Sequence, residues 1–146
     1  MEIVQATAMH LNEVAVLFDA YRTWYHQEPD FHGALAYIDD RLRLQDSVIY
    51  IAMEGEEIVG FTQLYPIFSS VRMKKSWLLN DLYVLEAHRG KGAASALLDK
   101  AARLAEDTGA GWILLQTDIT NTNAQALYEK KGYVRDTTCY YYYREV

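Results

Sequence analysis

Apolar residues in the first third of the chain recur at the three- and four-residue spacing of amphipathic helices. The first predicted helix has its apolar positions at Val14, Leu17, Phe18, Tyr21 and Tyr25. Thr7 precedes this helix and can cap its first turn. Pro29 then interrupts the helical pattern, and Asp30 can cap a second helix. The second helix has its apolar positions at Leu35, Ile38, Leu42 and Leu44.

From residue 47 onward the pattern changes to short apolar runs bounded by turn residues, which are typical of strands. Counting a short run near the N-terminus, we expect strands over residues 3–6, 47–53, 58–68, 77–85, 112–117 and 137–144. Gly60 lies inside one of them, where the missing Cβ indicates the close approach of another backbone. The last predicted strand has tyrosine at each of residues 140–143, so two tyrosines should point to each of its faces.

A strand, a basic glycine turn and a long amphipathic helix follow one another directly over residues 77–105. The turn, residues 88–94, reads H-R-G-K-G-A-A. The helix presents one apolar face, made of Leu97, Leu98, Ala101, Ala102 and Ala105. Unpaired N–H groups at a helix N-terminus bind anions, and glycine lets the backbone come close to a ligand. Arg89 and Lys91 add positive charge, so this pattern predicts that a phosphate-bearing group binds the turn.

Other common chemical motifs are missing from the chain. A dinucleotide-binding fingerprint would need glycine where Ser95 stands, and a P-loop would need serine or threonine after Lys91, where Gly92 stands. The histidines are scattered without metal-ligand spacing, so we expect no metal site. No G-x-S-x-G sequence supports a serine hydrolase.

The glycine turn resembles a known cofactor-binding signature. Arg89-x-x-Gly92-x-Ala94 is similar to the acyl-CoA pyrophosphate-binding motif (Q or R, x, x, G, x, G or A) of the GNAT superfamily of N-acetyltransferases. A second segment, from Asn121 through Tyr128 to residues 132–133, is similar to the later cofactor-binding helix of that family. The resemblance implies a single α/β (α+β) domain over residues 1–146 with the GNAT acyl-CoA N-acyltransferase fold. That fold has a mixed, mostly antiparallel sheet flanked by helices, with a split between the fourth and fifth strands.

Composition narrows the class of protein only slightly. The chain has 146 residues, which is one domain's worth, and no apolar run reaches the roughly 20 residues of a membrane span. The net charge of -6 argues against a general nucleic-acid binder and is compatible with a cationic substrate. The single cysteine, Cys139, excludes an internal disulfide, and the first residues lack the pattern of a secretory signal. We therefore expect a cytoplasmic protein.

The resemblance implies acetyl-CoA as co-substrate, no metal, and a role for each matched residue. The backbone of Leu82 and Val84 would bind the pantetheine arm, which enters the split like an added strand. The pyrophosphate would lie on backbone N–H groups of Arg89, Gly90, Lys91, Gly92, Ala93 and Ala94. Asn121 would bind the pantetheine or place a water, and Tyr128 would protonate the departing thiolate.

The resemblance leaves the general base open. Related polyamine and aminosugar acetyltransferases carry Glu-Asp where this chain has Asn80 and Asp81, and asparagine cannot accept a proton. Asp81 acting through a water, or Asp118 after the following strand, are the remaining carboxylates. Adjacent strand residues point to opposite faces, so Asn80 and Asp81 can face one pocket only across a β-bulge, which the family often has there.

In this family the link between the first two helices usually forms a wall of the acceptor site. Trp24, Tyr25 and Glu28 are therefore candidates for binding an amine, together with Asn80 and Asp118. The alternative is that the aromatic residues pack in the core and the acidic residues are solvated.

We expect an N-acetyltransferase that moves an acetyl group from acetyl-CoA to a primary amine by direct attack in a ternary complex. The sequence is closest in pattern to yeast-type histone and polyamine acetyltransferases and their bacterial relatives. The acceptor could be a polyamine, another small amine or an amino acid; a protein lysine ranks lower because the short chain has no peptide-binding insertion. The alternative is a non-catalytic acyl-CoA-binding sensor. We expect no nucleic acid or membrane partner, and a homodimer formed through the tyrosine-rich end.

Overall fold

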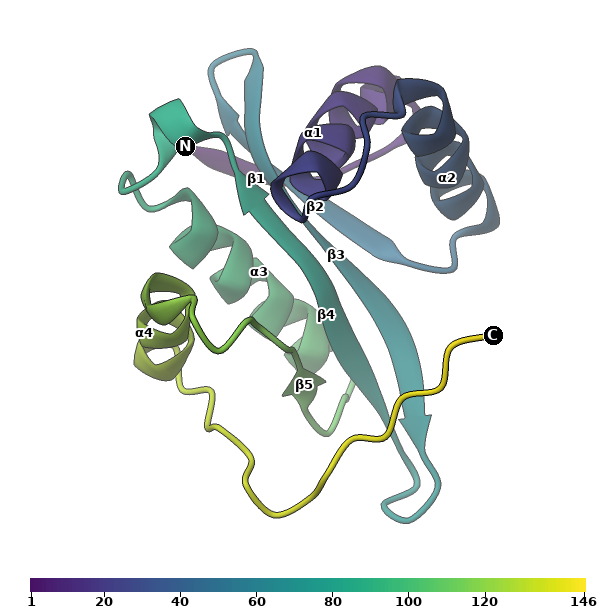
Figure 1. The fold of residues 1–146 in the computed structure, drawn as a ribbon, viewed down its shortest axis with the longest axis vertical. Coiled ribbons are helices and arrows are strands. Elements are labelled where there is room, and N and C mark those ends of the chain that lie inside the picture. Colours follow the sequence, from purple (N-terminus) through teal and green to yellow (C-terminus); the bar gives the residue numbers. More distant parts are fainter. The chain divides into compact units, whose positions relative to one another are not determined.

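A five-stranded sheet forms the centre of residues 1–116 in the strand order β1-β2-β3-β4-β5 (Figure 1). The strands are β1 Glu2–Gln5, β2 Val48–Glu54, β3 Glu57–Ser69, β4 Lys74–Val84 and β5 Ile113–Leu114. The first four pair antiparallel, while β4 and β5 pair in parallel. This computed structural model describes residues 1–146, in two compact units of residues 1–116 and 117–146. The mixed, mostly antiparallel sheet confirms the predicted fold class.

Helices cover both faces of this sheet (Figure 1). A short 3-10 turn, η1 Ala8–His10, leads into α1 Leu11–Trp24, and α2 Phe31–Leu44 follows. On this face, Val14 and Leu17 of α1 pack with Ile38 of α2 against Ile51 and Phe61 of the sheet. The opposite face carries α3 Ala93–Asp107, whose buried positions are Ala93, Leu97, Leu98, Ala101 and Ala105. The predicted apolar positions of the three helices are buried or half-buried, except for Tyr25, Leu44 and Ala102, which are exposed.

The predicted cap and close approach are also confirmed. The carboxylate of Asp30 accepts a hydrogen bond from the Gly33 N–H at 2.9 Å and so caps α2. A Cβ on Gly60 would lie 2.9 Å from the Tyr83 carbonyl oxygen of the neighbouring strand. Only glycine lets β3 and β4 come this close, and the pairing at this point places the end of β4.

The fourth and fifth strands separate after two residue pairs. Trp77 pairs with Ile113 and Leu78 with Leu114, whereas β4 continues to Val84 alongside β3. The predicted strand over residues 112–117 is therefore shorter than expected, because β4 pairs with it only at Trp77 and Leu78. The remaining edge of β4 carries backbone groups that β5 does not use.

The second unit contains one helix, α4 Thr122–Lys130. The Asn121 side chain caps it by accepting a hydrogen bond from the Ala124 N–H at 3.2 Å. Gly132 follows the helix with a φ of 90°, a conformation that favours glycine at a helix end. Both features agree with the predicted helix between Asn121 and Gly132.

The prediction of a strand over residues 137–144 is wrong. This segment has no regular secondary structure, and the four tyrosines at 140–143 are between 74% and 94% exposed. The free thiol of Cys139 is exposed as well. A run of tyrosines favours a strand only where a neighbouring strand takes up its backbone N–H and C=O groups, and no strand of this chain does so. None of the helices is long and apolar enough to cross a membrane.

Candidate active site

One extra residue in β4 sets the geometry of the site. Gln63 of β3 pairs with Asp81, but the next residue, Leu64, pairs with Leu79. Asn80 is therefore the unpaired residue of a β-bulge, as the family resemblance implied. A bulge shifts every later residue of its strand by one position, so side chains and peptide groups beyond it exchange directions.

The exchange of directions can be followed in the backbone hydrogen bonds. Before the bulge, the Trp77 N–H donates to Trp112 on the β5 side, at 3.2 Å. After the bulge, the Leu85 N–H donates to Val59 on the β3 side, at 2.9 Å. Peptide groups alternate along a strand, so the N–H groups of the even-numbered residues after the bulge point away from β3. These residues are Leu82 and Val84, the two that the resemblance assigns to the pantetheine arm.

The same bulge brings Asp81 onto the face covered by α1 and α2. Asp81 is 3% exposed, and its carboxylate accepts side-chain hydrogen bonds from Gln63 Nε2 at 2.8 Å and from Asn80 Nδ2 at 3.0 Å. Gln63 in turn accepts a hydrogen bond from the Ser47 hydroxyl at 2.9 Å. Burial raises the pKa of Asp81, and hydrogen bonds from Gln63, Asn80 and Tyr21 oppose that rise. The carboxylate is thus fixed in place by amides and hydroxyls.

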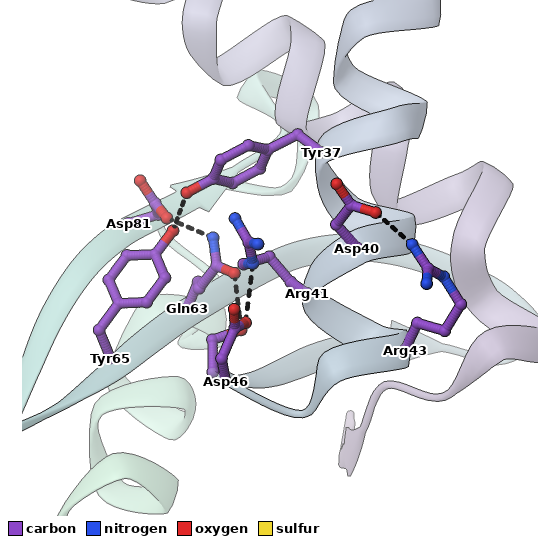
Figure 2. A network of polar contacts seen from close by, with 9 residues as sticks. Tyr37, Asp40, Arg41, Arg43, Asp46, Gln63, Tyr65 and Asp81 are labelled. Atoms are coloured by element: carbon purple, nitrogen blue, oxygen red, sulfur yellow. Dashed lines mark hydrogen bonds and ion pairs between the residues drawn. The ribbon is translucent and has the colours of Figure 1, made fainter.

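Asp81 opens into a pocket of about 280 Å³ between the helices and the sheet. Its lining residues are Phe18, Tyr21, Arg22, Tyr25, Gln27, Tyr37, Tyr65, Asn80 and Asp81. The hydroxyls of Tyr37 on α2 and Tyr65 on β3 meet at 2.6 Å, and Asp81 lies beside this pair (Figure 2). Burial and the Tyr37 hydrogen bond raise the pKa of Tyr65, so the Tyr65 hydroxyl stays protonated. The pocket combines aromatic walls with one buried carboxylate, a combination suited to an amine.

The basic glycine turn has the backbone of an anion site. Gly90 and Gly92 have φ values of 75° and 92°, and a Cβ on either would meet open space. Gly92 is the N-cap of α3, and its carbonyl accepts the first helical hydrogen bond, from Ala96 at 3.0 Å. The N–H groups of Ala93 and Ala94, in the first turn of α3, donate to no group of the chain. Together with the positive end of the helix dipole and the exposed Lys91, they suit a phosphate group.

Arg89 differs from the rest of the turn. Its backbone N–H donates to the Glu86 carbonyl, at 3.2 Å, so it is not available to an anion in this structure. Its side chain turns back: Nε donates to the Val84 carbonyl at 2.9 Å, and the guanidinium lies 4.6 Å from the Trp24 ring centroid. Arg89 therefore connects the turn to the end of β4 and to the end of α1.

The predicted acceptor residues do not all lie in the pocket. Tyr25 and Asn80 line it together with Asp81, whereas Trp24 and Glu28 do not. Trp24 is 55% exposed and faces Arg89, and Glu28 uses its backbone carbonyl to accept a hydrogen bond from Arg22 at 3.2 Å. A role for Trp24 or Glu28 toward an amine stays a prediction.

Asp118, Asn121 and Tyr128 belong to the second unit. Asp118 is exposed and accepts hydrogen bonds from the Thr120 hydroxyl and N–H, at 2.6 and 2.8 Å, which lower the pKa of Asp118. A lowered pKa makes this carboxylate a weaker base, and its geometry is that of a turn before α4. Asp81 is therefore the better candidate base on both burial and pKa.

Tyr128 lies on α4, where its ring centroid is 6.0 Å from that of Tyr133. The Tyr133 hydroxyl is buried with no partner, and its burial, followed by the nearby Tyr128, raises the pKa of Tyr133 to about 12. Across the chain, no cluster of three or more His, Cys, Asp or Glu side chains could hold a metal ion.

Most residues of the pocket wall were not predicted from the sequence. Gln63 could have been recognised from the sequence. It lies two residues after Phe61 on the same strand, so it shares the buried face of Phe61 although it is polar, and both residues are fully buried. Tyr37 and Tyr65 come from elements that are distant in sequence, so no local pattern pairs them. No local pattern marks Arg22 as a pocket residue either, because it lines the pocket only once α1 packs on the sheet.

With this geometry in place, the comparisons with known proteins identify the family. Residues 13–133 match the model of the Acetyltransferase (GNAT) family. The chain belongs to the GNAT family of acetyltransferases. The matched range crosses the boundary between the two units at residues 116 and 117, so the family pattern includes α4 as well as the sheet.

Relatives of this GNAT protein agree with the assignment. The protein of Bacillus subtilis (strain 168) named Uncharacterized N-acetyltransferase YhfO is 46% identical over 142 residues, which cover 97% of this chain and 95% of that protein. The yeast (Saccharomyces cerevisiae) protein named D-amino-acid N-acetyltransferase HPA3 is 30% identical over 104 residues, covering 71% of this chain and 64% of that protein.

Solved structures extend the likeness to the fold. A crystal structure of a probable acetyltransferase has a TM-score of 0.95 at 39% sequence identity, covering 100% of this chain and 98% of that one. The structure of AAC(6')-Iy in complex with the bisubstrate analog CoA-S-monomethyl-acetylneamine has a TM-score of 0.81 at 22% identity, covering 99% and 97%. The chain is thus an acetyl-CoA-dependent N-acetyltransferase of the GNAT fold, and the predicted family, fold and enzyme class are confirmed.

Proposed function

We propose that this GNAT enzyme acetylates the primary amine of a small molecule: a polyamine, another small amine or an amino acid. The observation that carries the proposal is the bulge at Asn80. It presents a buried carboxylate, Asp81, to an aromatic pocket and turns the N–H groups of Leu82 and Val84 toward the open strand edge. Acceptor and donor sites would then meet at one point of β4. A pocket of about 280 Å³ has room for a small acceptor.

The residues of the donor side fit acetyl-CoA. The open edge of β4 offers Leu82 and Val84 to an extended amide-bearing arm, and the start of α3 offers N–H groups to the pyrophosphate through Gly90, Lys91, Gly92, Ala93 and Ala94. We propose Asn121 as a further contact of the pantetheine and Arg89 as the residue that connects this turn to β4. Acetyl-CoA supplies an activated acetyl group, and one of the β4 N–H groups would polarise its carbonyl.

On the acceptor side the amine must lose a proton before it can attack. We propose that Asp81 accepts this proton, directly or through a water, since Asn80 cannot. Burial moves the pKa of Asp81 upward, toward that of a useful base. Tyr128 would donate a proton to the leaving sulfur. The attack is direct, with both substrates bound, and no acetylated residue of the chain is involved.

We further propose that both units act as one catalytic domain over residues 1–146, because the family match spans both. A cytoplasmic location is part of the proposal, since the one cysteine is a free thiol that suits a reducing compartment. The proposed assembly is a homodimer in which residues 140–143 are covered by the second copy.

The test is thiol release from acetyl-CoA with a panel of small amines. We expect turnover that falls by about 10²–10⁴-fold in Asp81→Asn, the usual value of a general base. Asp107→Asn, an exposed carboxylate at the end of α3, is the matched control and should keep full activity. Binding of acetyl-CoA without turnover of any amine would contradict the proposal and favour the acyl-CoA sensor.

A further inference from the structure

The acceptor pocket contains one group of each charge. Among its lining residues only Asp81 is acidic and only Arg22 is basic. The other members are aromatic or amide side chains: Phe18, Tyr21, Tyr25, Gln27, Tyr37, Tyr65 and Asn80. A site with this pair of charges offers one partner to an ammonium group and another to an anion.

The Arg22 side chain is held in place by hydrogen bonds and still has N–H donors without a partner. Its Nη1 donates to the Asp19 carboxylate at 3.1 Å and to the Glu28 carbonyl at 3.2 Å. Asp19 also accepts the Asp30 N–H at 2.9 Å, so the guanidinium is anchored to the loop between α1 and α2. An arginine has five N–H donors, and those on Nε and Nη2 have no partner within the chain. A fixed guanidinium with two free nitrogens is the usual partner of a carboxylate.

The same charges disfavour a polyamine. Each further ammonium group of a polyamine would need its own carboxylate, and only Asp81 lines the pocket. A second ammonium would instead lie in the same pocket as the Arg22 guanidinium, where like charges repel. An acceptor whose second charge is negative avoids this repulsion and uses the free donors of Arg22.

We infer that the acceptor is zwitterionic: a primary amine that also carries a carboxylate, with the amine toward Asp81 and the carboxylate toward Arg22. This inference rests on the proposed function and selects one substrate class from it. The reaction is otherwise unchanged: the amine nitrogen forms the new bond to the acetyl carbon, the carbon–sulfur bond breaks, and the amine proton leaves through Asp81. The substrate carboxylate takes no part in the chemistry and serves binding alone.

The test compares matched acceptors that differ only by the carboxylate: lysine with cadaverine, ornithine with putrescine, and tyrosine with tyramine. We expect at least tenfold higher kcat/KM for the amino acid of the preferred pair. A series of ω-amino acids of increasing length, measured alongside, reports the distance between the two charged groups of the pocket. In Arg22→Gln the advantage should disappear through a higher KM for the amino acid, while the decarboxylated amine keeps its KM.

A purely structural role of Arg22 in the loop would raise both KM values together and would overturn the inference. Arg22→Lys keeps the charge without the two-pronged geometry, so it should restore part of the preference. Arg43→Gln is the matched control, because Arg43 pairs with Asp39 and Asp40 at the end of α2 and does not line the pocket.

Calorimetric titration of each matched pair, with CoA present, measures acceptor binding independently of turnover. Tighter binding of the carboxylate-bearing member, lost in Arg22→Gln, would support the inference even if no acceptor were acetylated. In that case only the proposed function would fail. Equal or tighter binding of the decarboxylated amines would overturn the inference and leave acetyl transfer intact.

Discussion

Asp81 is a carboxylate held in the interior without a cation bonded to it. Its hydrogen-bond donors are the amides of Gln63 (Figure 2) and Asn80 and the hydroxyl of Tyr21. Gln63 is in turn oriented by Ser47. Amide donors satisfy the oxygens but compensate burial less than an ion pair would, so the pKa of Asp81 is raised. The buried carboxylate thus lowers the stability of the native state, while it provides the position and the basicity that proton transfer needs.

Asp81→Asn should therefore raise the melting temperature at neutral pH while it lowers turnover. A raised pKa means that the native state binds the proton of Asp81 more tightly than the unfolded state, whose value is about 3.9. Stability then falls as pH rises from that value through the raised pKa, and the amide removes this loss. The stabilisation should be largest above the raised pKa and should fade as the pH approaches about 4.

Thermal unfolding of both proteins between pH 4 and pH 8 gives the measurement. The amide can be accommodated, since Gln63 can turn its amide over and still bond Ser47, whose hydroxyl donates or accepts. A lower melting temperature of Asp81→Asn at pH 8 would show that the native state stabilises the charge, contrary to the prediction.

Tyr128→Phe should lower kcat by about 10²–10⁴-fold with little change in acetyl-CoA affinity, because a proton is needed only as the thiolate departs. The substitution keeps the ring that packs near Tyr133, so we expect the fold to persist. Rapid kinetics and calorimetry measure the two quantities separately. Tyr133→Phe is the control: its hydroxyl has no hydrogen-bond partner, so its loss should leave kcat unchanged. Near-normal kcat in Tyr128→Phe would make Tyr128 a packing residue.

Among the elements, the strand–turn–helix of β4 and α3 brings the chemistry together. The Gly92→Val variant tests the turn. Valine resists the φ of 92° and adds bulk where the pyrophosphate is proposed to lie, so acetyl-CoA affinity should fall at least tenfold, about 1.4 kcal/mol. Gly55→Val is the matched control, since Gly55 has a φ of 62° and open surroundings in the β2–β3 turn. Equal losses of affinity in both variants, or none in Gly92→Val, would remove the turn from the cofactor site.

The elements also show what a sequence can and cannot predict. The helices, the Asp30 cap of α2 and the strands β2 to β4 follow from local sequence, because the buried residues of each element recur at that element's own period. The Thr7 cap was wrong for the first helix: Thr7 precedes the short turn η1, and the N-cap of α1 is His10. The short β5 and the irregular C-terminal segment do not, since a strand exists only where another strand takes its hydrogen bonds. The pocket could not be predicted for a similar reason: Tyr37 of α2 and Tyr65 of β3 come into contact only when the helix packs on the sheet. The backbone of the glycine turn before α3 was predictable because its residues are consecutive.

At the scale of the whole molecule, the exposed tyrosines at residues 140–143 indicate an interface with another chain. Four consecutive tyrosines that are 74% to 94% exposed form an unusual surface for a lone protein. Tyrosine is enriched at interfaces, where its ring is buried and its hydroxyl finds a partner. The backbone of this segment is not used by any strand of its own chain, so a second copy could take up its N–H and C=O groups.

We therefore expect a homodimer, with a mass twice the 16.8 kDa of one chain in light scattering at micromolar concentration. Replacing Tyr141 and Tyr142 with glutamate should give the mass of a single chain, because burying the new charges in an interface is costly. Val71→Glu provides the matched control: Val71 is 95% exposed in the β3–β4 turn, and a charge there should leave the dimer intact. A single-chain mass of the unaltered protein would exclude the dimer. A dimer that survives the tyrosine substitutions but dissociates in Val71→Glu would move the interface to the β3–β4 turn.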